Sequence, residues 1–304
     1  MTMLRIYLQL VPLFFMFGLG VFLHRMRFAE RHHGEFLLRF MFFITLPCLV
    51  FLKLTQVHLD LHQLSLPLVS VGVNLGCMLV TLAVTRFIHV PRQTRGAMLV
   101  STMIANNAFM FPFMQAVYGD QGFAYAVLFD FGNAMVTSTL TYAMAFHFGP
   151  DRHTSKTLIT KTLRSPLVWA LFLAVAVNFL ALPLPHTLRL VLAPIGGMTN
   201  PLILISLGIM FSPKLNQLRL LSATLFIKMG LGLILGVLIA RLLGLHDLSF
   251  TVAMLCAAGP IGFNALTFST LAGLDAEFAS SAVSASILLG VVYIPLLMHL
   301  AQHI

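Results

Sequence analysis

The stretches Asn106-Asn107-Ala108-Phe109-Met110-Phe111-Pro112 and Gly259-Pro260-Ile261-Gly262-Phe263-Asn264 interrupt two hydrophobic spans of this chain. Inside a bilayer every backbone N–H and C=O needs a partner within the protein, so a helix breaks at that depth only where the freed groups are buried or line a cavity. Matching breaks in the two halves of one chain point to a binding site near the middle of the membrane.

The composition is that of a multi-pass membrane protein. The chain is 59% hydrophobic and 9% charged, whereas soluble domains are roughly 25% charged. Crossing the bilayer takes about 20 apolar residues. The first stretch is too long for a signal peptide and lacks a cleavage site, so we expect it to be retained. We predict an all-α polytopic fold with ten transmembrane helices, near residues 4–24, 36–53, 64–88, 96–117, 121–147, 165–182, 187–212, 217–243, 248–272 and 277–300.

The net charge of +9 indicates topology and not a nucleic-acid partner, because the basic residues fall in alternate loops. Cytoplasmic loops carry the excess of Lys and Arg. We therefore expect a protein of the cytoplasmic membrane, with both termini outside the cytoplasm and the 149–164 loop inside it. The residues of this pattern are Arg25, Arg27, Arg31, Arg86, Arg92, Arg95, Arg152, Lys156, Lys161, Arg164, Lys214 and Arg219.

The basic loop at 149–164 divides the chain into halves, 1–148 and 165–304, with five spans each. An odd number of spans per half gives the second half the opposite orientation, which predicts two inverted five-helix repeats. Pro201 follows Pro47 by 154 residues. The same offset of 154 residues pairs Asn106 with Pro260, Asn74 with Lys228 and Asp130 with Ser284. The alternative to inverted repeats is ten unrelated helices with ordinary prolines.

Each break is expected to expose a helix N-terminus. Pro112 removes a backbone donor and predicts a kink or an end in helix 4. A helix N-terminus carries about half a positive charge and unpaired N–H groups, so two of them favour an anion, most naturally a carboxylate. The alternative is two proline kinks with asparagines that cross-link helices. The candidate substrate contacts are Asn106, Asn107, Phe109, Pro112, Gly259, Pro260, Phe263 and Asn264, with the two phenylalanines facing an apolar part of the substrate.

Two charged residues, Asp130 and Lys228, lie well inside spans. Such a residue costs at least about 2.5 kcal/mol on insertion scales, so it is a functional candidate by default. Asp130 shares a helical face with Asn133 and is a candidate proton acceptor. Lys228 is a candidate partner for Asp130 or for an anionic substrate, and Asn74 completes this coupling group. The structural alternative is an Asp130–Lys228 ion pair between helices 5 and 8.

The remaining reactive residues do not predict an enzyme. Cys48, Cys77 and Cys256 lie in spans without ligand spacing, which favours buried small hydrophobic residues over a disulfide or metal site. The spans hold no nucleophile–base pair, no second aspartate and no metal motif. We expect no cofactor, while proton or sodium coupling stays open.

The segment from Asn106 to Asn133 closely resembles the auxin efflux carrier family. It runs through Pro112-Phe-Met-Gln-Ala-Val-Tyr-Gly119 and Ala124-Tyr-Ala-Val-Leu-Phe-Asp-Phe-Gly-Asn133. Gly273-Leu-Asp-Ala-Glu-Phe-Ala-Ser-Ser-Ala-Val283 resembles the same family, and the resemblance covers essentially the whole chain. The family includes the plant auxin exporters and bacterial carriers for malonate, malate and similar acids.

The resemblance implies a bile-acid-symporter-like fold in which broken helices 4 and 9 cross. It also implies a mobile transport domain of helices 3–5 and 8–10, and a scaffold of helices 1, 2, 6 and 7 through which two copies dimerise. The family's crossover asparagine falls on Asn106 and its second-half proline on Pro260. This chain is one residue short between asparagine and proline, so the ligand-facing residue is either Asn106 or Asn107.

Together these features predict a secondary transporter that exports or exchanges an organic anion by an elevator mechanism. The alternative is an uncoupled, channel-like uniporter or a non-transporting sensor of the same fold. The substrate, the direction of transport and the coupling ion stay open.

Overall fold

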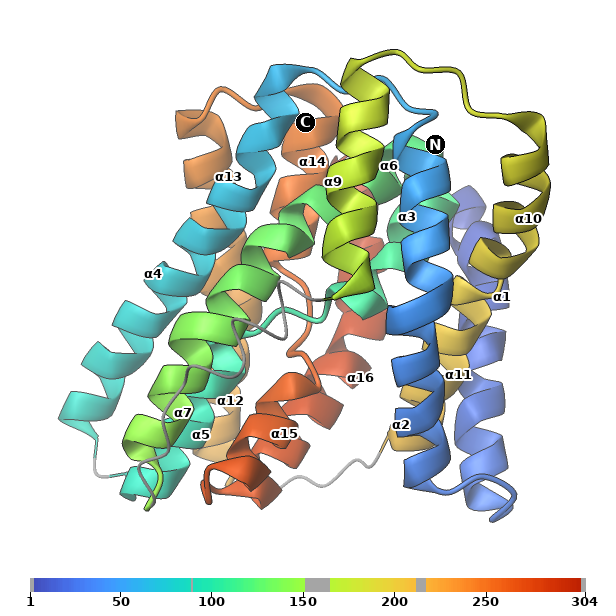
Figure 1. The fold of residues 1–304 in the computed structure, drawn as a ribbon. Helices are drawn as coiled ribbons and strands as arrows, with labels where there is room; N and C mark the ends of the chain where they lie inside the picture. Colours follow the sequence, from blue (N-terminus) through green and yellow to red (C-terminus); the bar gives the residue numbers. More distant parts are fainter. Residues whose placement is uncertain (1–2, 89, 151–164, 212–216, 302–304) are drawn as a thin grey trace. The chain divides into compact units, whose positions relative to one another are not determined.

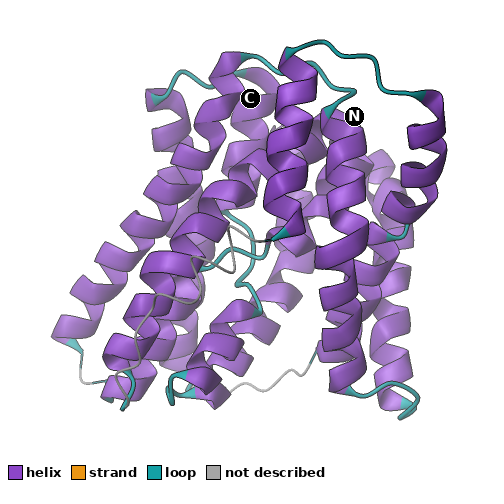
Figure 2. Ribbon diagram, viewed as in Figure 1, coloured by secondary structure: helices purple, strands orange, loops and turns teal. Residues whose placement is uncertain are grey.

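The protein is described here by a computed structural model that covers residues 3–88, 90–150, 165–211 and 217–301. Within these ranges the chain forms helices joined by loops (Figures 1 and 2). The helices are α1 Met3–Arg25, α2 Arg31–Phe40, α3 Leu46–Leu54, α4 Leu66–Phe87, α5 Arg92–Met103, α6 Asn107–Val136, α7 Tyr142–Phe148, α9 Pro166–Phe179, α10 His186–Gly197, α11 Thr199–Met210, α12 Leu218–Leu225, α13 Gly232–Leu242, α14 Asp247–Ala257, α15 Asn264–Leu271 and α16 Ala276–Leu300. Short turns extend several of them: η1 Met41–Thr45, η2 Leu61–Ser65, η3 Thr137–Thr141 and η4 Phe226–Leu231.

Six helical runs of the described chain are long and apolar enough to cross a membrane, which confirms an all-helical, polytopic membrane protein. Two shorter apolar helices, α9 and α14, accompany them. The count of ten spans stays a prediction. The six runs are Leu8–Arg25, Arg31–Leu54, Leu61–Phe87, His186–Met210, Leu218–Leu242 and Ala276–Leu300.

The chain separates into two compact units. Unit 1 comprises Met1–Leu61, Ala108–Val127 and Lys161–Phe211, and unit 2 comprises His62–Asn107, Leu128–Thr160 and Ser212–Ile304. Predicted helices 1, 2, 6 and 7 therefore fall in unit 1, together with residues 108–127, which the sequence analysis assigned to the mobile set. Which unit moves stays a prediction.

Unit 1 is built from helices that pack in pairs. α1 packs along α11, and α3 packs against both α9 and α10. The two buried hydroxyls of Thr45 and Thr199, 154 residues apart in sequence, form a hydrogen bond of 3.0 Å. The side chain of Asn178 in α9 donates to the Leu54 carbonyl at the end of α3, at 2.6 Å. Buried polar contacts therefore fix the positions of α3, α9 and α11.

Unit 2 packs α4, α5 and α7 in one group and α13, α14 and α16 around them. Leu99 and Met103 of α5 and Val136 of α6 form a buried apolar cluster between these helices. Asp275 caps the N-terminus of α16 by accepting the N–H of Phe278 at 2.9 Å, and it accepts the Thr94 hydroxyl of α5 at 2.8 Å. The side chain of Asp275 thus links the beginnings of α5 and α16.

α6 contains the end of predicted span 4 and the beginning of predicted span 5. The prediction that Pro112 ends a helix is wrong, because α6 continues through Pro112 and departs from helical φ and ψ angles only at Gly119. The kink at Pro112 stays a prediction. Pro112 falls in the second turn of α6, where its ring removes a single intrahelical hydrogen bond. At Gly119 the backbone has φ 67° and ψ −158°, a conformation that only glycine adopts readily, and the chain changes direction between predicted spans 4 and 5.

The cytoplasmic assignment of the 149–164 loop stays a prediction. Arg152, Lys156, Lys161, Arg164 and Lys214 lie outside the described residues. Two of the three cysteines, Cys77 and Cys256, are buried as expected, whereas Cys48 is half-buried.

Candidate functional site

Both predicted interruptions are real breaks between helices in unit 2. α5 ends at Met103 and α6 begins at Asn107. α14 ends at Ala257 and α15 begins at Asn264. The segment between α5 and α6 is buried, and so are Ala258–Gly262 of the second break. The first break therefore precedes the Asn107–Pro112 part of the quoted stretch.

The two breaks pair with each other through their backbones. The N–H of Asn106 donates to the Pro260 carbonyl at 2.8 Å, and the N–H of Gly262 donates to the Ile104 carbonyl at 3.1 Å. These bonds form one antiparallel bridge, between Ala105 and Ile261. Each break thus supplies backbone partners that the other lost when its helix ended.

Glycine at 262 allows this close approach. A Cβ atom at that position would lie 2.7 Å from Cγ2 of Ile104 and 3.0 Å from the Ala105 carbonyl oxygen. Any larger residue would have to push the two crossing segments apart. The close contact with Ile104 and Ala105 of the first break therefore explains why residue 262 is glycine.

A side chain on a neighbouring helix holds each crossing segment. Asn133 of α6 pairs with Ala105: its Nδ2 donates to the Ala105 carbonyl at 3.3 Å, and its Oδ1 accepts the Ala105 N–H at 3.1 Å. In the other segment, the Ile261 N–H donates to the Ser286 hydroxyl of α16 at 2.9 Å. The positions of both breaks are thus set by polar side chains of the helices behind them.

The carboxylate of Asp130 lies in the same polar cluster. Its Oδ1 accepts hydrogen bonds from Nδ2 of Asn107 at 2.7 Å and from Nδ2 of Asn133 at 3.0 Å. Asn74 of α4 donates from its own Nδ2 to Oδ1 of Asn133 at 3.2 Å. Asn74, Asn107, Asp130 and Asn133, predicted as separate candidates, therefore form one connected network, which we call the amide cluster.

The remaining candidates take different positions. Asn106 and Asn107 are buried, at 4% and 2% exposure, and the Asn107 Oδ1 has no hydrogen-bond partner among the described residues. Gly259 and Pro260 are buried in the crossing segment, Phe263 is half-buried and Asn264 is exposed. Phe109 and Pro112 belong to the part of α6 in unit 1, where the Phe109 ring stacks on Phe113 with centroids 4.7 Å apart.

The structural alternative of an Asp130–Lys228 ion pair is wrong. The described residues place no carboxylate within ion-pair distance of Lys228, and Asp130 is instead bound by two amides. Lys228 is fully buried in η4, and its Nζ has no hydrogen-bond partner in the described chain. Whether Asp130 and Lys228 meet depends on which face of each helix contacts its neighbour. The spacing of residues along the sequence does not determine this.

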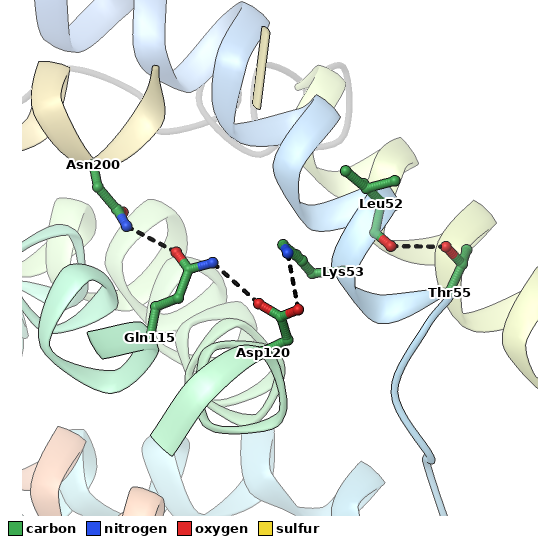
Figure 3. A network of polar contacts seen from close by, with 6 residues as sticks. All are labelled: Leu52, Lys53, Thr55, Gln115, Asp120 and Asn200. Atoms are coloured by element: carbon green, nitrogen blue, oxygen red, sulfur yellow. Dashed lines mark hydrogen bonds and ion pairs between the residues drawn. The ribbon is translucent and has the colours of Figure 1, made fainter. Parts of the chain in front are cut away.

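Unit 1 contains a polar network that the sequence analysis did not identify (Figure 3). Lys53 Nζ of α3 forms an ion pair with Oδ2 of Asp120 at 2.8 Å. Gln115 Nε2 donates to Oδ1 of Asp120 at 3.2 Å, and Asn200 of α11 donates to Oε1 of Gln115 at 2.8 Å. The available signal was a lysine and an aspartate, each at the end of an apolar stretch. The network ties the 108–127 segment to α3 and α11.

A buried crossing of two broken helices inside an all-helical, apolar chain defines an integral membrane transport protein. The family model described as "Membrane transport protein" matches residues 5–298, so the chain belongs to that family. The family includes the auxin efflux carriers, so the resemblance seen in the sequence is confirmed.

Two relatives carry the same indication. An uncharacterized transporter of Methanothermobacter thermautotrophicus is 26% identical over 208 residues, which are 67% of this chain and 67% of the relative. An uncharacterized transporter of Methanocaldococcus jannaschii is 22% identical over 265 residues, which are 84% of this chain and 85% of the relative.

Proposed function

We propose that this protein is a secondary transporter of organic anions and that the substrate carboxylate binds where the two breaks cross. The observation that carries this proposal is the pair of backbone hydrogen bonds between Ile104–Asn106 and Pro260–Gly262. They bring the segments that lead into α6 and α15 together within unit 2. Helix N-termini attract anions through their free N–H groups and partial positive charge.

Asn106 is the proposed side-chain contact for the carboxylate. It lies immediately before α6, and its backbone N–H bonds to the Pro260 carbonyl of the second break. The amide cluster then has a positioning role, because it holds Ala105 and the α6 start in place. Phe263, at the beginning of α15, is the proposed contact for an apolar part of the substrate.

Two contacts between residues 154 positions apart support the inverted repeats. Thr45 bonds to Thr199 in unit 1, and Asn106 bonds to Pro260 in unit 2. Equivalent residues of two repeats meet where the pseudo-twofold axis passes between them. The offset first derived from Pro47 and Pro201 thus recurs in two independent contacts.

The proposed mechanism is an elevator in which helices 3–5 and 8–10 carry the site past the scaffold of helices 1, 2, 6 and 7. In this account the 108–127 segment must release its contacts with α3 and α11, and the Lys53–Asp120 ion pair is one of them. The protein would reside in the cytoplasmic membrane with both termini outside the cytoplasm and dimerise through the scaffold.

The experiment is counterflow in proteoliposomes, with acids chosen by a thermal-shift screen of mono- and dicarboxylates. Ligands that bind the folded state raise its apparent stability. Alanine at Asn106, Asn107 or Pro260 should abolish counterflow of the selected acid while leaving the protein folded. Unchanged counterflow in all three variants would contradict the assignment of the site. Substrate accumulation that follows only the membrane potential would favour a uniporter.

A further inference from the structure

Lys228 is the most unusual charged residue in unit 2. Its side chain is fully buried, at 0% exposure, and its Nζ finds no hydrogen-bond partner among the described residues. It lies in the π-helical turn η4, which interrupts the run from α12 to α13. Such turns are rare and occur often at functional sites. An amine in this position requires an explanation, because no described residue forms a hydrogen bond or an ion pair with it.

The groups that face Lys228 carry no compensating charge. Two titratable side chains contact the backbone of η4: the thiol of Cys77 on α4, at 3.5 Å from the Ile227 carbonyl, and the hydroxyl of Tyr293 on α16, at 3.5 Å from the Met229 carbonyl. α16 also carries Glu277, which is exposed in its first turn, and His299, which is half-buried in its last turn. The arginines of the neighbouring helices are not buried with Lys228. Arg86, Arg92, Arg219 and Arg241 are exposed, and Arg95 packs against Phe148.

The segment that carries Lys228 contacts the face of α4 that bears Asn74 of the amide cluster. Cys77, which contacts the residue before Lys228, follows Asn74 by three positions on α4, so the two side chains share one helical face. Asn74 donates to Asn133, and Asn133 donates to Asp130. The Cys77 contact with η4 and the Asn74 member of the cluster are therefore about one helical turn apart on α4, roughly 5 Å along its axis.

The charge state of the amine follows from this environment. Burying an ammonium ion without an acceptor costs several kcal/mol even after the protein relaxes, whereas an uncharged amine avoids most of that cost. This environment therefore favours the uncharged form of the amine. It can become an ammonium only where the transport cycle brings water to it.

We propose that Lys228 is the proton-binding site that couples transport to a proton gradient. The proposal rests on the anion-transport function and names its coupling ion. The Nζ lone pair takes a proton from hydronium and releases water when the site is open to one side, and the resulting ammonium gives that proton back to water on the other side. A transported monoanion is then accompanied by one positive charge.

The test compares two assays on the same variants in proteoliposomes. Counterflow measures exchange without a gradient, and accumulation is driven by an imposed pH gradient. Lys228→Met should keep counterflow and lose accumulation, whereas the wild type shows both. Arg241→Gln, which changes an exposed cation on the same helical run, should keep both. If the wild type shows no counterflow, the proposed function fails and not the coupling site.

Three results would overturn the assignment of Lys228. The first is pH-driven accumulation that persists in Lys228→Met, and the second is accumulation that is lost only in Asp130→Asn. The third is loss of counterflow as well in folded Lys228→Met, which would make the lysine a binding residue. In this conformation the amine is a buried polar group without a partner, and an apolar side chain of similar size avoids the cost of burying it. A lower unfolding temperature in Lys228→Met would therefore show a structural partner for the ammonium and contradict the proposal.

Lys228→Arg provides a second variant. Arginine stays protonated under all practical conditions, so it cannot deliver the proton. The proposal expects loss of pH-driven accumulation in this variant too, and retained accumulation would overturn it.

Discussion

Asn133 hydrogen-bonds both backbone groups of Ala105, accepting its N–H at 3.1 Å and donating to its carbonyl at 3.3 Å. In this way the Asn133 side chain replaces the helical partners that Ala105 loses at the break. The same amide accepts from Asn74 and donates to Asp130. One residue therefore ties the crossing segment to the polar side chains of Asn74 on α4 and Asp130 on α6.

Asn133→Ala should destabilise unit 2 strongly. A buried polar group left without its partner costs about 1–3 kcal/mol, and this change removes the side-chain partner of Ala105, Asn74 and Asp130 at once. We expect a clear fall in unfolding temperature and loss of counterflow. Asn74→Ala, which removes the single hydrogen bond from Asn74 to Asn133, should cause a smaller fall. Equal unfolding temperatures for the two variants would contradict the central role of Asn133.

Gly262→Ala should disturb the pairing of the two breaks. The added Cβ would approach the Ala105 carbonyl oxygen to 3.0 Å and Cγ2 of Ile104 to 2.7 Å, and overpacking of this kind costs typically about 1–3 kcal/mol. Gly18→Ala is the matched control, because it has open space around its Cβ and lies in a helix where alanine is favoured by about 0.5–1 kcal/mol. In a thermal unfolding assay, the unfolding temperature should therefore fall in Gly262→Ala and rise in Gly18→Ala.

Gly119→Ala isolates backbone conformation from packing. No atom lies within 4 Å of a Cβ built at Gly119, but its φ is +67°. Holding a residue other than glycine in this region costs about 1–3 kcal/mol. We expect lower stability than in the wild type, and an unchanged unfolding temperature would show that the turn between the two parts of α6 relaxes freely.

The Lys53–Asp120 ion pair should act on conformational change more than on stability. Its side chains are 22% and 40% exposed, and solvent screening limits such pairs to about 1 kcal/mol or less. In the elevator account, Asp120→Asn and Lys53→Met weaken a contact that must break, so they should alter the counterflow rate with little change in unfolding temperature. The exchanged pair Lys53→Asp with Asp120→Lys should restore the wild-type rate. Failure of the exchange to restore it, with the protein folded, would mean that the contact is not part of the moving interface.

Much of the architecture could be predicted because it follows from hydropathy and from residues that cannot continue a helix. The Gly259–Pro260 interruption and the Asn106 region marked both breaks, and Asp130 and Asn133 were placed correctly on one face. Pro112 does not mark the break, because α6 continues through it at the loss of one intrahelical hydrogen bond. The first break occurs instead at Ile104–Asn106, whose sequence carries no glycine or proline.

The contacts between helices could not be predicted. A lone aspartate and a lone lysine inside spans suggested a pair, yet Asp130 accepts from two amides and Lys228 Nζ has no hydrogen-bond partner in the described chain. The direction of each side chain depends on how its helix is rotated and on which helix packs against it. For the same reason, Gln115 and Asn200 were not recognised as links between α6 and α11.

Carboxylate binding to the Asn106→Asp variant tests the central claim most directly. The substitution keeps the size of the side chain and the backbone N–H that bonds to Pro260, and an acidic residue at a helix N-terminus favours folding. Isothermal titration of the purified protein with the acid selected by thermal shift should show binding to the wild type and none to Asn106→Asp, at an equal or higher unfolding temperature. Unchanged affinity in a folded Asn106→Asp protein would place the anion site elsewhere.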